Sequence, residues 1–182
     1  NGTLWFWGNN SAVGPLMPSE VPFGGIISTP VQISGSWTAI HMHSITNAAA
    51  IRSDGALFTW GSASLGELGD GTRTAKSVPV QIGTSSWTAI SGGPNFCVAI
   101  RSDGLLFSWG SNVAGQLGDG TVNSRSSPVQ IGMFSWTAVS CGASHVVAIR
   151  SDGGLFTWGY GGLGQLGSSH KCQCRQHLCY KI

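Results

Sequence analysis

The sequence predicts an all-β fold built from repeated small antiparallel sheets. Two observations predict it. A unit of about fifty residues is written three times after part of an earlier copy, and each complete copy carries an Asp-Gly pair between apolar runs. In addition, no window holds apolar residues at helical spacing without an interrupting Gly or Pro, and 28 Gly among 182 residues are typical of a loop-rich β chain.

Each unit contains a predicted β-hairpin centred on Asp-Gly. The hairpins run over 51–61, 100–110 and 149–159, and each begins Ile-Arg-Ser-Asp-Gly and ends Trp-Gly. Asp-Gly accepts the positive φ angles of a tight primed turn, and apolar or β-branched residues flank it on both sides. We therefore expect two antiparallel strands joined by such a turn in every copy.

Two further strands complete each unit. One begins Trp-Thr-Ala and lies at 37–40, 87–90 and 136–139. The other reads Pro-Val-Gln-Ile and lies at 30–33, 79–82 and 128–131. Proline is found at a sheet edge or as the first residue of a strand, so we expect this second strand to lie at an edge or to begin at its proline. Four strands of five or six residues, with their turns, use about fifty residues, which is the content of one β-propeller blade.

The repeat divides the chain into blades. We expect a partial blade at 1–30, blades at 31–79 and 80–128, an incomplete blade at 129–167, and an atypical tail at 168–182 that is rich in Cys, His and Lys. The predicted fold class is therefore a partial β-propeller of about three to four four-stranded blades.

The residues of the third unit resemble a known repeat. They read Val129-Gln130-Ile131, Trp136-Thr137-Ala138-Val139, Gly142-Ala143-Ser144-His145, Asp152-Gly153, Trp158-Gly159 and Gly164-Gln165-Leu166-Gly167. This pattern closely resembles the regulator of chromosome condensation repeat, strongly over 31–167. The resemblance implies a β-propeller, normally of seven blades. It does not imply one function, because that family includes nucleotide exchange factors, ubiquitin-ligase domains and secreted enzyme inhibitors.

The number of units raises the question of how the sheet edges are covered. Three units and part of another are fewer than seven blades, and unpaired edge strands recruit other chains. One hypothesis is that two copies, or this chain and a sequence-related partner, close a ring of about seven blades. The other is that the chain is a piece of a longer propeller protein. The sequence leaves both open.

Composition indicates which environment and which partners suit the chain. Charged residues are only 9% of the chain, so the surface is polar but nearly uncharged. Six Lys and Arg stand against seven Asp and Glu in residues 1–167, without the basic face that nucleic acid requires. No apolar run is long enough to span a membrane. The Ser, Thr and Gly content favours an extracellular or virion-associated protein without defining the compartment.

The cysteines give one weak metal candidate. Cys172, Cys174, His177 and Cys179 offer four soft ligands for zinc, but their spacing is too crowded for a familiar knuckle. An aberrant or unstructured tail is the competing interpretation. The sequence indicates no cofactor.

The tryptophans are expected to be structural. Six of the eight recur in register, and Trp5 and Trp7 lie on the same strand motif. Packing within or between blades explains this recurrence better than ligand stacking does.

Positions that differ between copies are the candidate partner-binding residues. Repeated positions serve the blade, whereas loop positions that differ can serve a partner. Large apolar, aromatic and Arg side chains are the types that anchor interfaces. The candidates are His41, Met42, His43, Arg73, Lys76, Val122, Arg125, Met133, Phe134 and Tyr160.

The predicted function is that of a non-enzymatic scaffold. It would bind a protein partner or copies of itself through inter-strand loops or open blade edges, as a homo-oligomer or part of a larger assembly. One alternative is a structural appendage subunit of a virion or cell-surface fibre. Another is nucleotide exchange on a small GTPase. The resemblance implies that such exchangers use an insertion from one blade, and no insertion longer than one residue interrupts the repeats here. No paired carboxylates or nucleophile and base favour catalysis.

Overall fold

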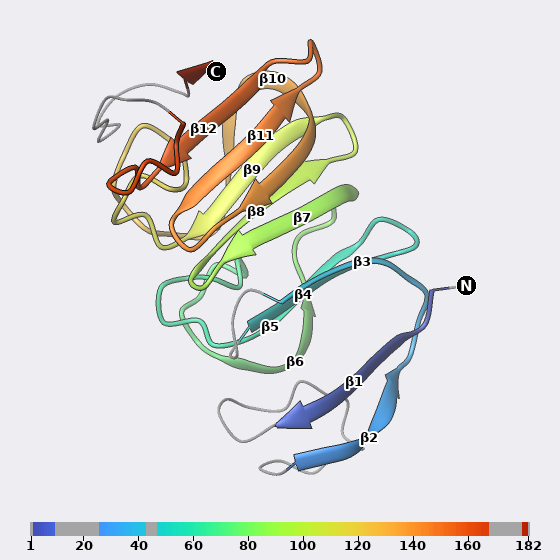
Figure 1. Cartoon of the computed structure of the whole chain (residues 1–182). Helices are drawn as coiled ribbons and strands as arrows, with labels where there is room; N and C mark the ends of the chain where they lie inside the picture. Colours follow the sequence, from blue (N-terminus) through green and yellow to red (C-terminus); the bar gives the residue numbers. More distant parts are fainter. Residues whose placement is uncertain (1, 10–25, 43–46, 168–179, 182) are drawn as a thin grey trace.

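The computed structural model describes residues 2–9, 26–42, 47–167 and 180–181. Within these ranges the chain is made of β-strands, turns and loops, and no helix is present. The sheets follow one another through the molecule from the β1–β2 pair to the strands around β12 (Figure 1). No helix in the described ranges is long and apolar enough to cross a membrane.

The strands lie where the repeat predicts them. They are β1 (Leu4–Asn9), β2 (Ile26–Ile33), β3 (Trp37–Met42), β4 (Asn47–Arg52), β5 (Leu57–Gly61), β6 (Lys76–Gln81), β7 (Trp87–Gly93), β8 (Phe96–Arg101), β9 (Leu105–Gly110), β10 (Arg125–Cys141), β11 (His145–Arg150), β12 (Leu155–Gly159) and β13 (Tyr180–Lys181). All adjacent pairs are antiparallel.

Hydrogen bonding groups these strands into three sheets. A two-stranded sheet holds β1 and β2, a four-stranded sheet has the order β3-β4-β5-β6, and a seven-stranded sheet has the order β13-β12-β11-β10-β9-β8-β7. The all-β prediction and the partial-propeller architecture are confirmed.

The seven-stranded sheet differs from the expectation that every hairpin has a separate sheet. Strand β10 pairs with β9 through its first part, up to Ser135, and with β11 from Trp136 onward. It bends at Gly132, where φ is +62°. The equivalent Gly83 has a φ of +61°, but the chain leaves the strand there. One continuous strand therefore joins two blades in the later copy, whereas a loop separates them in the earlier one.

The sheets are out of phase with the predicted repeat limits. Strand β6 pairs with β5, so Pro-Val-Gln closes one sheet instead of opening the next. The limits at 79/80 and 128/129 consequently fall inside β6 and β10. The tail predicted at 168–182 lies outside the described residues except for β13.

The hairpin turns are wider than the tight primed turn that Asp-Gly predicts. The N–H of Gly55 donates to the carbonyl of Arg52, and the N–H of Arg52 donates to the carbonyl of Ala56, at 2.8 and 2.9 Å. Gly55 has a φ of +86°. A hydrogen-bonded turn that ends on a left-handed Gly is the bulged alternative to a two-residue loop, and Gly supplies the same positive φ in both.

Three apolar clusters lie between neighbouring blades. Alternate residues of a strand point to opposite faces, and both faces are buried in β4 and in β8. In β4, Ala48 and Ala50 pack with Leu4 toward β1 and β2, whereas Ala49 and Ile51 pack toward β7 and β8. The third cluster joins β8 and β9 to β11 and β12. The core is therefore a series of interfaces between blades.

The tryptophan prediction is correct for the repeated positions and wrong for two. Trp109 and Trp158 are completely buried or nearly so, while Trp5 and Trp7 are 47% and 61% exposed. Trp7 stands at the repeat position of Trp60, which packs on the sheet before it. Within the described residues no sheet lies on the corresponding side of β1, and Trp7 is exposed there.

Candidate partner-binding surface

The antiparallel pairing gives each sheet two ends. The Asp-Gly turns 52–55, 101–104 and 150–153 lie at one end, called here the turn end. Strands β5, β9 and β12 finish at the other, called the loop end, from which the loops 62–75 and 111–124 leave.

Six of the predicted binding residues lie at the loop end. They are Met42, Arg73, Lys76, Val122, Arg125 and Tyr160. Three of them are large apolar or aromatic side chains that are about half exposed, at 49% for Met42, 56% for Val122 and 48% for Tyr160. The N–H of Gly71 donates to the carbonyl of Ser126 at 2.8 Å, which holds the 62–75 loop against the start of β10.

A buried carboxylate organises the 111–124 loop. The Asp119 side chain is 4% exposed and pairs with Arg125 at 2.7 Å. It also accepts hydrogen bonds from the Thr121 N–H and hydroxyl and from Asn112 Nδ2, at 2.9, 2.7 and 3.0 Å. Burial alone would raise the pKa of Asp119, but the hydrogen bonds from Thr121 and Arg125 outweigh it and lower the pKa below its ordinary value. The guanidinium of Arg125 is therefore part of the scaffold as well as a surface group.

The 62–75 loop uses the same arrangement with a weaker cation contact. Asp70 accepts from the N–H and hydroxyl of Thr72 at 2.9 and 2.7 Å, and the Lys76 ammonium lies 3.3 Å away. Burial would raise the pKa of Asp70, and these hydrogen bonds lower it on balance. Both loops are therefore held by their own aspartate, which leaves the neighbouring Arg73 and Val122 on the surface.

Two predicted residues near β3 have different outcomes. Nε2 of His41 lies 2.8 Å from the carbonyl oxygen of Gly92, a contact that links β3 to β7. His41 therefore contributes to the joint between two sheets. His43 lies outside the described residues.

Met133 and Phe134 lie at the opposite end from the other candidates. Ser135, which follows them, pairs with Leu105 beside an Asp-Gly turn. Met133 is 88% exposed. The Phe134 ring lies under the guanidinium of Arg150, with 4.6 Å between Cζ and the ring centroid. The structure thus divides the predicted residues between the two ends instead of joining them in one site.

Each turn end carries an arginine paired with an aspartate. Arg52 donates to Asp54, Arg101 to Asp103, and Arg150 to Asp152. The hydrogen bond from Arg52, followed by that from the Ala56 N–H, lowers the pKa of Asp54 to about 2. The guanidinium also lies over the Phe of the next strand, 4.9 Å from the Phe58 centroid in the first copy.

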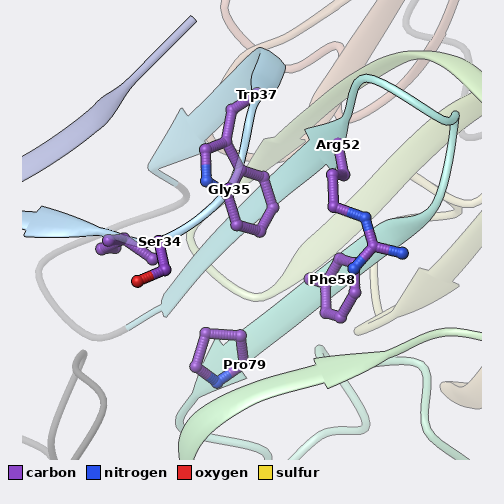
Figure 2. A pocket seen from close by; sticks show the side chains of 7 residues that line it. Ser34, Gly35, Trp37, Arg52, Phe58 and Pro79 are labelled. Carbon is purple, nitrogen blue, oxygen red and sulfur yellow. The ribbon is translucent and has the colours of Figure 1, made fainter.

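Two grooves contain the Trp and Phe that lie near these arginines, and Arg52 lines the first of them. The first is a cavity of about 410 Å³ lined by Ile33, Ser34, Gly35, Trp37, Arg52, Phe58 and Pro79. The guanidinium of Arg52 lies beside Phe58, with Trp37 across the opening and Pro79 on the remaining side (Figure 2). The second, about 620 Å³, is lined by the equivalent Ile82, Trp87, Phe107 and Pro128 together with Ser85 and the 69–72 turn.

The described residues contain no group of three or more His, Cys, Asp or Glu side chains that could hold a metal. The candidate ligands Cys172, Cys174, His177 and Cys179 lie outside the described residues. Cys97 is buried, with its Sγ 3.2 Å from the carbonyl oxygen of Glu67, and Cys141 is partly buried.

Comparison with known families explains the repeated hairpins. The Regulator of chromosome condensation (RCC1) repeat matches residues 54–100 and 103–149, and a second description of the same repeat matches 87–116 and 136–165. The chain belongs to the RCC1 repeat family. A search of the curated proteins finds no significant match to this RCC1 repeat chain.

Solved structures show the same fold. Human WBSCR16 is 23% identical with a TM-score of 0.72, and the match covers 87% of this chain and 44% of that one. Prp20p from Saccharomyces cerevisiae is 16% identical with a TM-score of 0.78, covering 100% and 47%. Yeast RCC1 (Prp20) bound to Kap60 is 17% identical with a TM-score of 0.78, and the match covers 100% of this chain and 45% of that one. The RCC1 repeat chain therefore spans less than half the length of these relatives, and the likeness concerns the fold.

Sequence reasoning named Phe134 but missed the grooves. Most lining residues of the first groove recur in the other copies, and recurrence by itself indicates a scaffold role. The available signal was the position two residues before the first Trp of each blade, where Gly35, Ser85 and Phe134 differ.

Proposed function

We propose that this RCC1 repeat chain is a non-enzymatic β-propeller scaffold that binds a protein partner through its loop end. The observation that carries the proposal is the contrast between repeated and variable positions there. Asp70 and Asp119 recur and hold their loops, while Arg73 in one copy is replaced by exposed Val122 in the next.

The third copy extends this contrast. Tyr160 stands where the earlier copies have Ser62 and Ser111, and it is half exposed although its N–H donates to the carbonyl of Ser144 at 2.8 Å. A side chain on a fixed backbone loses little conformational entropy when it binds, and an exposed Tyr supplies both apolar area and a hydroxyl. These properties favour a protein contact over a catalytic role.

A display library of random peptides, selected on the purified chain, tests the loop end. The variant carries Val122→Ser and Tyr160→Ser together. The matched control is Met133→Ser, which removes an exposed apolar side chain from the turn end. We expect selected peptides to bind the double variant at least about tenfold more weakly, as removal of interface anchors requires, and to bind the control unchanged.

Peptides that bind both variants as tightly as the original chain would refute the loop-end proposal. Proteins named with the relatives provide defined probes for the same comparison. One relative is described as bound to Kap60 and another by its binding to Gsp1p and histones. Each can be titrated against the chain and the two variants.

A second candidate is assembly with further blades, and one sheet face favours it. Ile51 and Ile100 are 1% and 3% exposed because the next blade covers them, but the equivalent Ile149 is 41% exposed. An apolar sheet face that its counterparts bury is suited to a second copy or to a related blade, as a ring or a fibre requires.

Sedimentation at micromolar concentration tests assembly. We expect the chain to associate and Ile149→Asp to weaken association, because a carboxylate would be buried against the added blade. The control is Val113→Asp, which places the same charge on a side chain that is 78% exposed in the 111–124 loop. A chain that remains monomeric would contradict assembly through this face.

A further inference from the structure

The same aromatic frame occurs at the turn end in the first blade (β3–β6) and in the third blade (β10–β12), with the second blade (β7–β9 and the start of β10) between them. The first Trp of each blade meets the Phe of the third strand edge to face, with centroids 5.5 Å apart for Trp37 and Phe58 and 5.4 Å apart for Trp136 and Phe156. The arginine of the Asp-Gly turn lies over that Phe, at 4.9 Å for Arg52 and 4.8 Å for Arg150.

One position decides whether the space beside this frame is filled. It lies two residues before the Trp and holds Gly35 in the first blade, Ser85 in the second and Phe134 in the third. Gly35 and Ser85 each border an open groove. In the third blade the Phe134 ring lies under Arg150, so this guanidinium contacts two aromatic rings.

The exposure of the three arginine side chains follows this difference. It is 39% for Arg52, 29% for Arg101 and 22% for Arg150. The guanidinium that Phe134 contacts is the least exposed, and the one beside Gly35 is the most exposed. In the first blade a delocalised cation thus remains accessible at the side of an apolar groove.

We propose that the first groove binds a phenylalanine side chain presented by a partner protein, in the place that Phe134 occupies in the third blade. The guanidinium is positive and weakly hydrated, and the face of an aromatic ring is negative, so the two are complementary. Trp37, Phe58 and Pro79 supply apolar contacts around the ring. An aliphatic side chain would gain the apolar contacts without the attraction to Arg52.

This site is independent of the loop-end proposal, because it lies at the opposite end of the sheets. The second groove has the same frame, with Arg101 over Phe107 at 4.7 Å and Trp87 edge to face with Phe107 at 5.4 Å. Arg101 itself does not line this groove, which extends to Asp70 and Lys76 at the loop end, so the second groove repeats only the aromatic part of the site, with Ser85 in the place of Phe134.

The test uses two capped peptides, Gly-Phe-Gly and Gly-Leu-Gly, titrated into isotopically labelled chain and observed by NMR. The reporters are the indole N–H of Trp37 and the Nε–H of Arg52. We expect the Phe peptide to shift both signals and to bind about two- to fivefold more tightly than the Leu peptide, the ratio that an exposed cation–π contact supports. Arg52→Gln should remove this preference, whereas Arg150→Gln should leave it unchanged.

Two variants at the deciding position test the same idea in the opposite direction. Phe134→Ser should uncover the frame of Trp136, Phe156 and Arg150, so that the Phe peptide also shifts the Trp136 indole and Arg150 signals. Ser85→Phe should close the second groove and abolish shifts at Trp87. Unchanged spectra elsewhere would show that the variants fold.

Equal shifts with both peptides, or no shift at Trp37 and Arg52 up to the solubility limit of the Phe peptide, would overturn the proposal. So would a Phe preference that persists in Arg52→Gln. A Phe-specific response at Trp37 that is transferred to Trp136 in Phe134→Ser supports it.

Discussion

The indole N–H of Trp109 donates to the main-chain carbonyl of Glu67 at 2.9 Å, across the boundary between two sheets. The next boundary repeats the contact, with Trp158 donating to the carbonyl of Gln116 at 3.0 Å. These bonds are buried between blades, where an unpaired donor is costly. The blades that carry Trp109 and Trp158 are therefore each tied to the loop of the blade before them by a specific polar contact.

Trp109→Phe is expected to lower the free energy of unfolding by about 1–3 kcal/mol, since it removes a buried hydrogen bond and leaves a smaller ring in the interface. Urea unfolding followed by circular dichroism measures the change. Trp5→Phe, on a side chain that is 47% exposed, is the control and should have little effect. Equal stabilities of the two variants would show that the Glu67 contact contributes nothing.

Gly69→Ala is expected to destabilise the protein more than Gly120→Ala. Both glycines have positive φ, +74° and +77°, so both substitutions carry a backbone cost of about 1–2 kcal/mol. At Gly69 the new Cβ would also lie 2.7 Å from Nε1 of the buried Trp109, whereas nothing lies within 4 Å at Gly120. Overpacking of this kind adds about 1–3 kcal/mol. Thermal and urea unfolding of both variants would show whether this difference exists.

Asp119 is expected to make stability depend on acid pH. Its pKa is lowered in the folded state, so its contribution is complete above the ordinary value of about 4 and is lost as the pH falls through the lowered pKa. Asp119→Asn should cost about 1–3 kcal/mol at pH 7 and make the unfolding free energy less sensitive to pH below about 4. Asp103→Asn, at an exposed turn carboxylate, is the control with a smaller effect. Parallel pH profiles for the original chain and Asp119→Asn would contradict this role.

The two described cysteines are expected to resist alkylation in the folded protein. Burial raises the pKa of the Cys97 thiol well above its usual range, and burial, opposed by the Ser91 hydrogen bond, raises the pKa of Cys141 to about 12. Very little thiolate is present at pH 8, and thiolate is the reactive form. Mass spectrometry after iodoacetamide treatment should find both unmodified until urea unfolds the chain. Rapid labelling of Cys97 under native conditions would contradict its burial between the sheets.

Much of the local structure could be predicted because it depends on short-range chemistry. Asp-Gly with its flanking apolar residues indicates a hairpin wherever it occurs, and a repeat of fifty residues supplies four strands each time. The exact turn was not predicted, since Gly55 has positive φ in both a primed turn and the bulged turn that the Arg52 carbonyl closes. Sequence alone does not distinguish these hydrogen-bond patterns.

The site was less predictable, because it depends on which residues meet across strands. Met133 and Val122, which differ between copies, are exposed, whereas Lys76 and Arg125 also pair with buried aspartates. Strand register places Phe134 at the opposite end from Arg125, although the two are close in the sequence. Comparison of the copies shows which positions vary, but it does not show at which end of the sheet each position lies.

By itself, the order of residues determined an all-β repeat with strands at regular intervals, because backbone preferences and alternation of apolar residues act within a few positions along the chain. The tertiary structure alone decided that Trp7 and Ile149 are exposed while their equivalents Trp60 and Ile51 are buried. Identical strand motifs differ in burial because burial depends on whether another sheet is packed against them.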